Sequence, residues 1–425
     1  MTRLAALAAA VLLCGAAGCG GGGGAGGAGP DGTSARGTSA PEPASPERQL
    51  TALLQRRAKA LQAGDARRLA ATATGAQRAR DRAEARNARG LPLRDVTLEA
   101  RDTEVRDAGA VLEVRAGYGI SGIRGRFEAE RILRARRTAK GWRIASSTSR
   151  RARLPWEVAR YGAHRTSHFT ILAPAALATD GLDDALEGGY VRMRDLLVKG
   201  ILRRRYLVVV AGSAADARRM TTGIRGVATL AAISDSAVRE KGPADRVIQV
   251  ASQRLLVVWP PFASLDSEGR ARVITHELTH AALAGHTSGR TPGWLLEGIA
   301  LYVSGDRRVG AAARFVAGDA GRVSRRALTL TGLSEPGAIG RLGGEGQSAA
   351  YAYSSAAAFY IAERFGRKRF LRLYDAFNDP ELSEPEGPEL TAAAVQRTLG
   401  VPLLQLERDL RRWIVTRAVV DPFAP

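Results

Sequence analysis

Two histidines and a glutamate lie within five consecutive residues, His276-Glu277-Leu278-Thr279-His280. Residues four positions apart on a helix share one face, so both imidazoles can bind the same metal ion. The carboxylate of Glu277 can then reach a water molecule at that ion. This spacing is typical of zinc sites that hydrolyse amide bonds, in which the glutamate acts as general base. The chain has only five histidines, which makes the match more specific. The pattern predicts a Zn²⁺ site on one helix.

A catalytic zinc site takes three protein ligands and keeps one position for water. Two residues could supply the third ligand. Sixteen residues separate Glu297 from His280, which leaves room for a loop and the start of a second helix. We expect the small residues Gly298 and Ala300 to let that helix approach the zinc helix closely. The alternative ligand is His286, six residues after His280.

The residues around Glu297 favour the first alternative through a family resemblance. The stretch Pro-Gly-Trp-Leu-Leu-Glu-Gly-Ile-Ala over residues 292–300, together with His-Glu-Leu-Thr-His, resembles gluzincin metallopeptidases of the peptidase MA-like group. The resemblance covers residues 273–303. It implies that Glu297 binds zinc with His276 and His280, and that a peptide or protein is the substrate. It further implies that a zinc-activated water attacks the peptide bond, with Glu277 as general base.

The position of His286 is that of the third histidine in metzincins, but two features argue against that family. Leu283 replaces the glycine at which metzincins turn. The chain has no methionine after the motif, whereas metzincins place a methionine turn beneath the metal.

The oxyanion of the transition state needs a hydrogen-bond donor besides the metal. Tyr351 and Tyr353 begin a predicted helix that resembles a helix after the active site in the gluzincin family. Either phenol could be that catalytic donor, and each could instead pack in the core. Leu301 stands where thermolysin-like enzymes have an aspartate that orients a ligand histidine. The partner of the ligand histidines is therefore not identified.

The N-terminus indicates export. Arg3 precedes an apolar stretch over residues 4–13, which is too short to span a bilayer and is typical of a signal peptide. Ala16-Ala17-Gly18-Cys19 resembles a bacterial lipobox. Residues 1–19 are therefore predicted to be a lipoprotein signal peptide with Cys19 as the lipidated residue. The protein would be anchored on the outer face of the bacterial cytoplasmic membrane, or secreted if Cys19 is not lipidated.

The region between this anchor and the zinc motif divides into two parts. Residues 20–47 are rich in Gly, Ser, Ala and Pro and predict a flexible linker. Residues 48–150 predict an amphipathic helix, a second helix over residues 66–86, and antiparallel strands near residues 96–98, 111–118, 124–133 and 142–147. This order resembles nuclear transport factor 2-like (NTF2-like) cone domains, which implies a spacer or binding module without catalysis.

Residues 154–420 form the predicted catalytic domain, in which strands precede a mostly helical half. Apolar runs at residues 169–172 and 205–211 predict strands, with a helix over residues 182–200 between them. Residues 247–251 and 255–259 predict a hairpin that turns at Ser252-Gln253-Arg254, and the second of its strands is a candidate edge for pairing with a peptide. Asp266 or Ser267 is expected to cap the zinc helix. The predicted class is α+β.

The net charge of +21 comes from 63 basic and 42 acidic residues, and only five of the basic residues are lysines. The arginines are spread along the chain without clusters that alternate with aromatic residues, which argues against nucleic-acid binding. Attraction to an anionic membrane or cell-wall surface fits an exported protein better. Two alternative functions stay open: a non-catalytic envelope lipoprotein whose N-terminal domain binds a partner, and a zinc amidase acting on cell-wall peptides. The sequence leaves the oligomeric state open.

Overall fold

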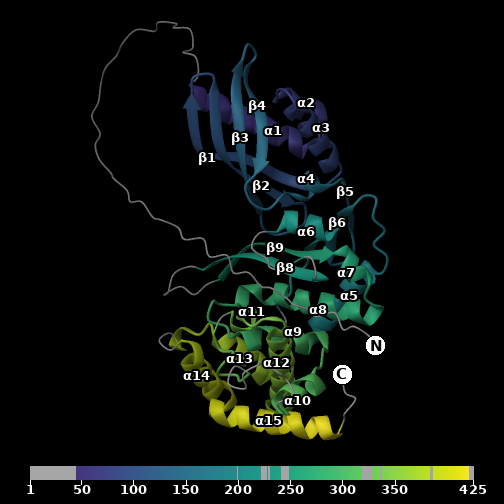
Figure 1. The fold of residues 1–425 in the computed structure, drawn as a ribbon, viewed down its shortest axis with the longest axis vertical. Helices are drawn as coiled ribbons and strands as arrows, with labels where there is room; N and C mark the ends of the chain where they lie inside the picture. Colours follow the sequence, from purple (N-terminus) through teal and green to yellow (C-terminus); the bar gives the residue numbers. More distant parts are fainter. Residues whose placement is uncertain are drawn as a thin grey trace, which may run out of the picture.

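A computed structural model describes residues 45–198, 200–221, 227, 230–240, 248–317, 328–335, 337–382 and 386–420. The predicted signal peptide, Cys19 and almost all of the predicted linker lie outside the described residues. The fold is mixed α+β, with two sheets and a helical C-terminal half, and this confirms the predicted class. In Figure 1 the first sheet and its helices lie at the top, the second sheet in the middle and the helical half at the bottom.

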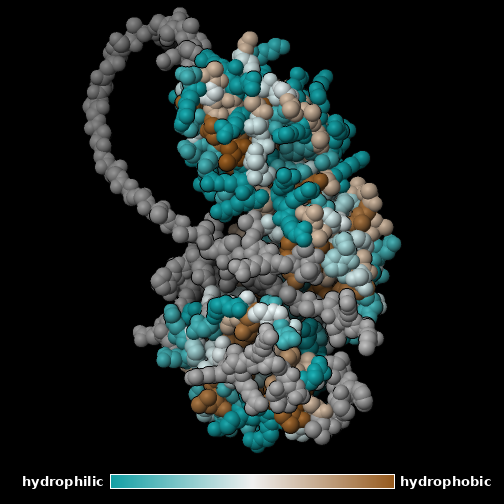
Figure 2. Space-filling view, in the orientation of Figure 1, coloured by the Kyte–Doolittle hydropathy of each residue, from teal (hydrophilic) through white to brown (hydrophobic). Residues whose placement is uncertain are grey.

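The N-terminal unit pairs three helices with a four-stranded antiparallel sheet in the order β1-β2-β3-β4. Its elements are α1 (Pro46–Gln62), α2 (Ala66–Ala71), α3 (Gln77–Ala88), β1 (Leu93–Arg106), β2 (Gly109–Ile120), β3 (Phe127–Thr138) and β4 (Gly141–Ser149). The strands are longer than the sequence pattern predicts. Figure 2 shows a largely hydrophilic surface over this unit.

The predicted continuous helix over residues 66–86 is wrong, because the chain leaves the helix between α2 and α3. The hydroxyl of Thr72 donates to the carbonyl of Leu69 and accepts from the buried guanidinium of Arg57. Ala73 then forms a bridge with Ile144 of β4. Hydrogen bonds to distant residues therefore end α2, and local propensity does not reveal them.

The second sheet has five strands in the order β5-β6-β7-β9-β8. Strands β6, β7 and β9 are parallel to one another, whereas β5 and β8 are antiparallel edge strands. The strands are β5 (Tyr161–Arg165), β6 (Phe169–Pro174), β7 (Tyr206–Ala211), β8 (Ala232–Glu240) and β9 (Ile248–Val258), and the helices among them are α4 (Pro155–Val158), α5 (Leu182–Leu196), α6 (Ala214–Met220) and α7 (Trp259–Ala263).

The predicted hairpin over residues 247–259 is wrong, because residues 248–258 form the single strand β9. The polar residues at its middle find partners in neighbouring elements. Gln253 donates to the carbonyl of Ala281 on helix α8 (Ser267–Leu283), and Arg254 pairs with Asp235 of β8. Strand β9 lies between β7 and β8, so it is not an edge strand as predicted. The edge beside it is β8.

The helical half begins with the helix that carries the zinc motif. Its helices are α8 (Ser267–Leu283), η2 (Ala284–His286), α9 (Gly293–Ser304), α10 (Val309–Ala317), α11 (Ala338–Arg341), α12 (Gly344–Phe365), α13 (Arg367–Ala376), η3 (Pro380–Leu382), α14 (Gly387–Leu399) and α15 (Leu403–Val420). Asp266 caps α8, because its Oδ1 accepts from the N–H of Gly269 at 2.7 Å. Within the described part of the chain, no helix has both the length and the apolar character needed to cross a bilayer.

The second sheet separates two hydrophobic cores. Alternate residues of its central strands point to opposite faces. Val208, Val210, Leu255 and Val257 join the core of the helical half, whereas the intervening residues Leu207, Val209, Leu256 and Val258 join the core of the N-terminal unit. Burial on both faces explains why these strands are continuous apolar runs. The sheet is thus a rigid support for α8.

Candidate metal centre

Two helices supply the residues of the predicted metal site. The whole second half of α8, residues 273–283, is buried, and it carries His276, Glu277 and His280. Helix α9 carries Glu297 one turn from its start. Helix α8 packs against strand β8, helix α5 and helix α9, so the polar residues of the motif are enclosed by structure from distant parts of the chain.

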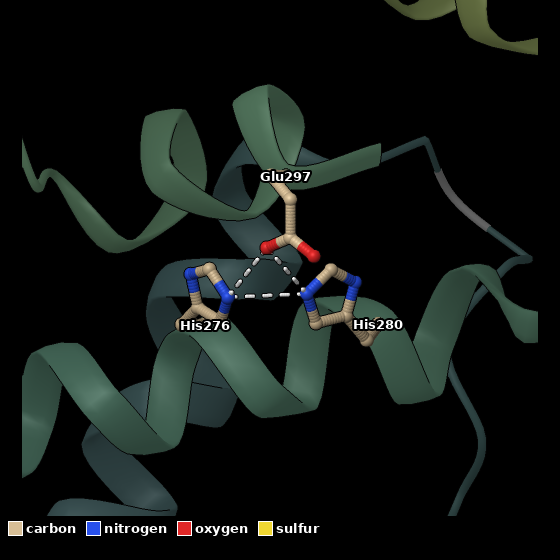
Figure 3. Close-up of side chains that lie close together, drawn as sticks. All are labelled: His276, His280 and Glu297. Atoms are coloured by element: carbon tan, nitrogen blue, oxygen red, sulfur yellow. Dashed lines mark hydrogen bonds and ion pairs between the residues drawn. The ribbon is translucent and has the colours of Figure 1, made fainter. Parts of the chain in front are cut away.

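The side chains of His276, His280 and Glu297 converge on one point (Figure 3). Glu297 Oε2 lies 3.3 Å from His276 Nε2 and 3.4 Å from His280 Nε2. The two Nε2 atoms are 3.1 Å apart. One donor atom from each residue lies within 4.8 Å of the others. Such an arrangement could hold a metal ion with two imidazoles and one carboxylate.

The burial of these groups also fits a metal. The side chains of His276, His280 and Glu297 are only 4%, 2% and 6% exposed. Glu297 Oε2 is buried, and the two imidazole Nε2 atoms that face it lie at 3.3 and 3.4 Å, longer than an ordinary hydrogen bond. A cation at the centre of the three donors would bind this buried oxygen and both nitrogens at once. The donor set of two nitrogens and one oxygen is one that zinc accepts, although other divalent metals also bind it.

The electrostatics link the three groups. Burial alone would raise the pKa of Glu297, but the adjacent imidazoles of His280 and His276 lower it to about 2. Burial likewise opposes the charged form of His280, yet the carboxylate of Glu297 outweighs it and raises the pKa of His280. Carboxylate and imidazole thus stabilise each other's charged forms in the metal-free site.

Glu277 is not one of the three donors, but its carboxylate interacts electrostatically with all of them. Its Oε2 accepts a hydrogen bond of 2.7 Å from the backbone N–H of Ser234 on β8. Burial raises the pKa of Glu277, and the neighbouring imidazoles and this hydrogen bond partly offset that rise. A carboxyl group with a raised pKa is suited to accept and later release a proton near neutral pH.

A glycine next to Glu297 sets the position of α9, but not in the way the sequence suggested. A Cβ on Gly298 would lie 2.8 Å from the carbonyl oxygen of Ser354 and 3.3 Å from the Cβ of Ala358, both on α12. Gly298 therefore permits close contact with α12, and the expectation that it faces the zinc helix is wrong. The close contact with α8 comes from α5, where a Cβ on Gly189 would lie 3.1 Å from Ile274.

His286 lies outside the group of three donors. It is at the end of η2 and is partly exposed, and its Nδ1 is 3.4 Å from a carboxylate oxygen of Asp375 on α13. The side-chain hydrogen bond with Asp375 raises its pKa. Of the two alternatives for the third donor, Glu297 is the one that the structure brings to the histidines.

The two candidate catalytic tyrosines lie near the middle of α12 and are buried. Burial raises the pKa of the Tyr353 phenol, and the charged groups that act on it are Glu407 and Arg411 of α15. Tyr353 therefore faces α15. Tyr351 makes a polar, aromatic or electrostatic contact of its own within the protein.

Sequence analysis missed Tyr374, which lies on α13 and is buried. Its hydroxyl is 2.6 Å from the hydroxyl of Thr287, which itself donates to the carbonyl of Leu283 at the end of α8. Burial raises the pKa of Tyr374 above its usual range, and the carboxylate of Glu297 adds to that rise. The phenol thus lies within electrostatic reach of a metal donor. In the sequence, Tyr374 is one apolar position of an amphipathic helix.

The described part of the structure does not show a side chain that orients the His280 imidazole through its second ring nitrogen. Leu301, at the position where an orienting aspartate was considered, is buried in the hydrophobic core. His280 Nδ1 is buried without a hydrogen-bond partner among the described residues.

No protein-family model matches this chain, and no curated protein is similar to it. Any function assigned to the metal centre therefore depends on the residues themselves.

Proposed function

We propose that this protein is a zinc metallopeptidase of the gluzincin type. The observation that carries the proposal is the convergence of His276, His280 and Glu297 on one buried point, with the buried carboxylate of Glu277 within electrostatic reach of these three residues. Three donors from two helices leave a coordination position open, which a catalytic zinc site requires. A purely structural zinc site would close that position with a fourth ligand and would need no buried glutamate next to it.

The chain's own residues would divide the work of hydrolysis. Bound zinc would supply a Lewis acid that lowers the pKa of water and polarises the scissile carbonyl. Glu277 would take the proton of the attacking water and pass it to the leaving amine. The N–H of Ser234 would hold the Glu277 carboxylate in place for both transfers. His276, His280 and Glu297 would fix the metal and exclude bulk water from it.

The sharpest test compares Glu277→Gln with the wild-type protein. The substitution keeps the shape of the side chain but removes the base. We expect stoichiometric zinc in both proteins and a loss of about 10²–10⁴-fold in the rate of casein hydrolysis for the variant. Glu268→Gln is the matched control, because Glu268 is an exposed glutamate in the first turn of the same helix. Equal activity of Glu277→Gln and wild type with full zinc content would refute the mechanism.

The same assay separates the alternative functions. Release of peptides from cell-wall fragments, with no cleavage of casein, would favour the zinc amidase. Zinc binding without hydrolysis of either substrate would favour a non-catalytic envelope lipoprotein.

We also propose that the protein is exported and lipid-anchored through Cys19, on the strength of the signal-peptide and lipobox pattern. Radiolabelled palmitate should enter the wild-type protein and not the Cys19→Ser variant. Equal labelling of the two proteins, or none in either, would refute the anchor and leave secretion as the alternative.

A further inference from the structure

The N-terminal unit contains a pocket of about 610 Å³ that is remote from the metal centre. Helices α1 and α2, strand β4 and the turn before β4 form its wall, at the top of the molecule in Figure 1. Its volume is in the range of small-molecule sites. Its lining residues are Leu53, Arg56, Lys59, Ala60, Ala63, Arg68, Ala71, Thr72, Lys140 and Arg143.

All of the charged residues that line this pocket are positive. Five of its lining residues are cationic, and none is acidic. Arg68 pairs with Asp65 at 3.4 Å, and Arg143 donates to the carbonyl of Trp142. The exposed side chains of Arg56, Lys59 and Lys140 have no hydrogen-bond or ion-pair partner among the residues that the structure describes. Two of the chain's five lysines therefore meet here, from segments far apart in the sequence.

Some arginines on the sheet of the same unit pair with acidic residues, whereas others of the unit, such as Arg80 and Arg82 of α3, have no such ion pair among the described residues. On the sheet, Arg106 pairs with Glu104, Arg115 with Glu128, Arg150 with Glu113 and Arg151 with Glu130. Like charges that share a concave surface repel one another. The absence of a carboxylate from the pocket lining thus leaves a positive potential that an anion would offset.

The shape of the pocket narrows the class of anion. Its apolar lining consists of Leu53 and three alanines, and these small side chains leave room between the cations. Lysine and arginine both bind phosphate, arginine by paired hydrogen bonds and lysine as a point charge. We propose that this pocket binds a phosphate-bearing anion, whose phosphates meet the cations and whose uncharged part meets the apolar lining.

Such a group could come from a soluble phosphate compound or from the headgroup of an anionic phospholipid. The second source would suit a chain that is anchored to a membrane through Cys19. The proposal does not depend on the metal centre or on peptide hydrolysis.

The test uses a double variant, Lys59→Ala with Lys140→Ala. Its control, Arg80→Ala with Arg82→Ala, removes the same charge from the exposed face of α3, where neither arginine lines the pocket. Titration calorimetry with sodium pyrophosphate should give a dissociation constant roughly 30-fold weaker for the pocket variant, if each lysine contributes as a cation does near an anionic surface. The control should bind like the wild type. Equal weakening in the two variants would show a general charge effect and overturn the site.

A second measurement identifies the source. Vesicles with 30% phosphatidylglycerol in phosphatidylcholine are sedimented with each protein in a common Cys19→Ser background, and binding to pure phosphatidylcholine is subtracted. Vesicle binding that pyrophosphate displaces, and that only the pocket variant loses, assigns a lipid headgroup. Pyrophosphate binding without vesicle binding assigns a soluble ligand. If the wild-type protein binds neither probe, the proposal is wrong.

Discussion

The backbone N–H of Ser234 donates a hydrogen bond of 2.7 Å to the carboxylate of Glu277. This bond connects the edge strand of the second sheet to the residue that we propose as general base. A side chain of α8 thus accepts the hydrogen bond from this N–H of β8. The position of the proposed base thus depends on the backbone of β8 as well as on the zinc helix.

Replacing Ser234 by proline should impair catalysis without loss of metal. Proline removes the N–H, and it is tolerated on an edge strand where that N–H is not part of the ladder. Loss of a hydrogen bond to a charged group costs about 1.5–3 kcal/mol, so we expect a fall in kcat of roughly 10–100-fold. The bond also favours the carboxylate form, so its loss should move the acid limb of kcat/KM to higher pH.

Ser234→Ala is the control for that substitution, because alanine keeps the N–H and removes only the hydroxyl. It should retain the activity, the zinc content and the pH profile of the wild type. A similar loss of activity in both variants would mean that the side chain or the fold of β8 matters, and not the hydrogen bond.

The identity of the third metal donor can be tested with two substitutions. Glu297→Ala removes a buried donor at 3.3–3.4 Å from both imidazoles, whereas His286→Ala removes a partly exposed residue paired with Asp375. Glu297→Ala should weaken zinc binding by more than about 100-fold, beyond the effect typical of a residue that only orients a ligand. His286→Ala should keep stoichiometric zinc. Competition with a chelator of known affinity measures both, and the reverse order would favour His286 as ligand.

The local parts of this site could be predicted from sequence because helix geometry fixes them. The spacing of His276 and His280 on one helix, and the cap at Asp266, need no knowledge of the rest of the chain. Glu297 could be named from its motif. Its placement against the histidines depends on contacts with α12 that no local pattern shows.

The wrong predictions share a physical cause. Polar residues that break a local sequence pattern find their partners in distant parts of the chain, and the pattern does not show those partners. Gln253 resembles part of a turn, yet its amide bonds to the carbonyl of Ala281, so β9 continues through it. Strand β8 has mixed polarity and was not predicted, because its partner β9 and the carboxylate of Glu277 lie further along the chain. Tyr374 was missed for the same reason, since only the folded chain brings its phenol near Glu297.

The stability of the metal-free protein should depend on pH through the pair His280 and Glu297. The pKa of His280 is raised above its unfolded value of 6.5, so its contribution is complete below pH 6.5 and is lost as pH rises through the raised pKa. The pKa of Glu297 is lowered from 4.5 to about 2, so its contribution is present above pH 4.5 and is lost as pH falls through about 2. In the presence of a chelator, the melting temperature should therefore decline above pH 6.5.

Zinc should reverse this dependence of the melting temperature on pH. Zinc binds the neutral imidazole, so a proton on His280 competes with the metal. Zinc affinity should therefore increase with pH through the same raised pKa. Glu297→Gln is the control, since it removes the carboxylate that raises the pKa of His280 and leaves other titrating groups in place. The difference in melting temperature between the metal-free proteins then reports the coupling of Glu297 to the titrating groups around it, of which His280 is one. A difference that does not change with pH would contradict the assigned coupling.

Substitution of Gly298 should disturb both stability and the metal site. The added Cβ of Gly298→Ala would lie 2.8 Å from the carbonyl oxygen of Ser354. Because real Cβ atoms essentially never come this close to another heavy atom, α9 and α12 must separate. Overpacking of this kind costs about 1–3 kcal/mol in the free energy of unfolding. Because Glu297 is the preceding residue, the shift of α9 should also weaken zinc binding.

Gly188→Ala provides the matched control for this substitution. Gly188 lies inside α5, and a Cβ there would meet no atom within 4 Å. Alanine is favoured over glycine within a helix by roughly 0.5–1 kcal/mol, so Gly188→Ala should be neutral or slightly stabilising and should leave zinc affinity unchanged. Denaturant unfolding and chelator competition on the two variants separate the packing effect from helix propensity. If Gly298→Ala and Gly188→Ala have the same free energy of unfolding and the same zinc affinity, then contact between α9 and α12 does not position Glu297.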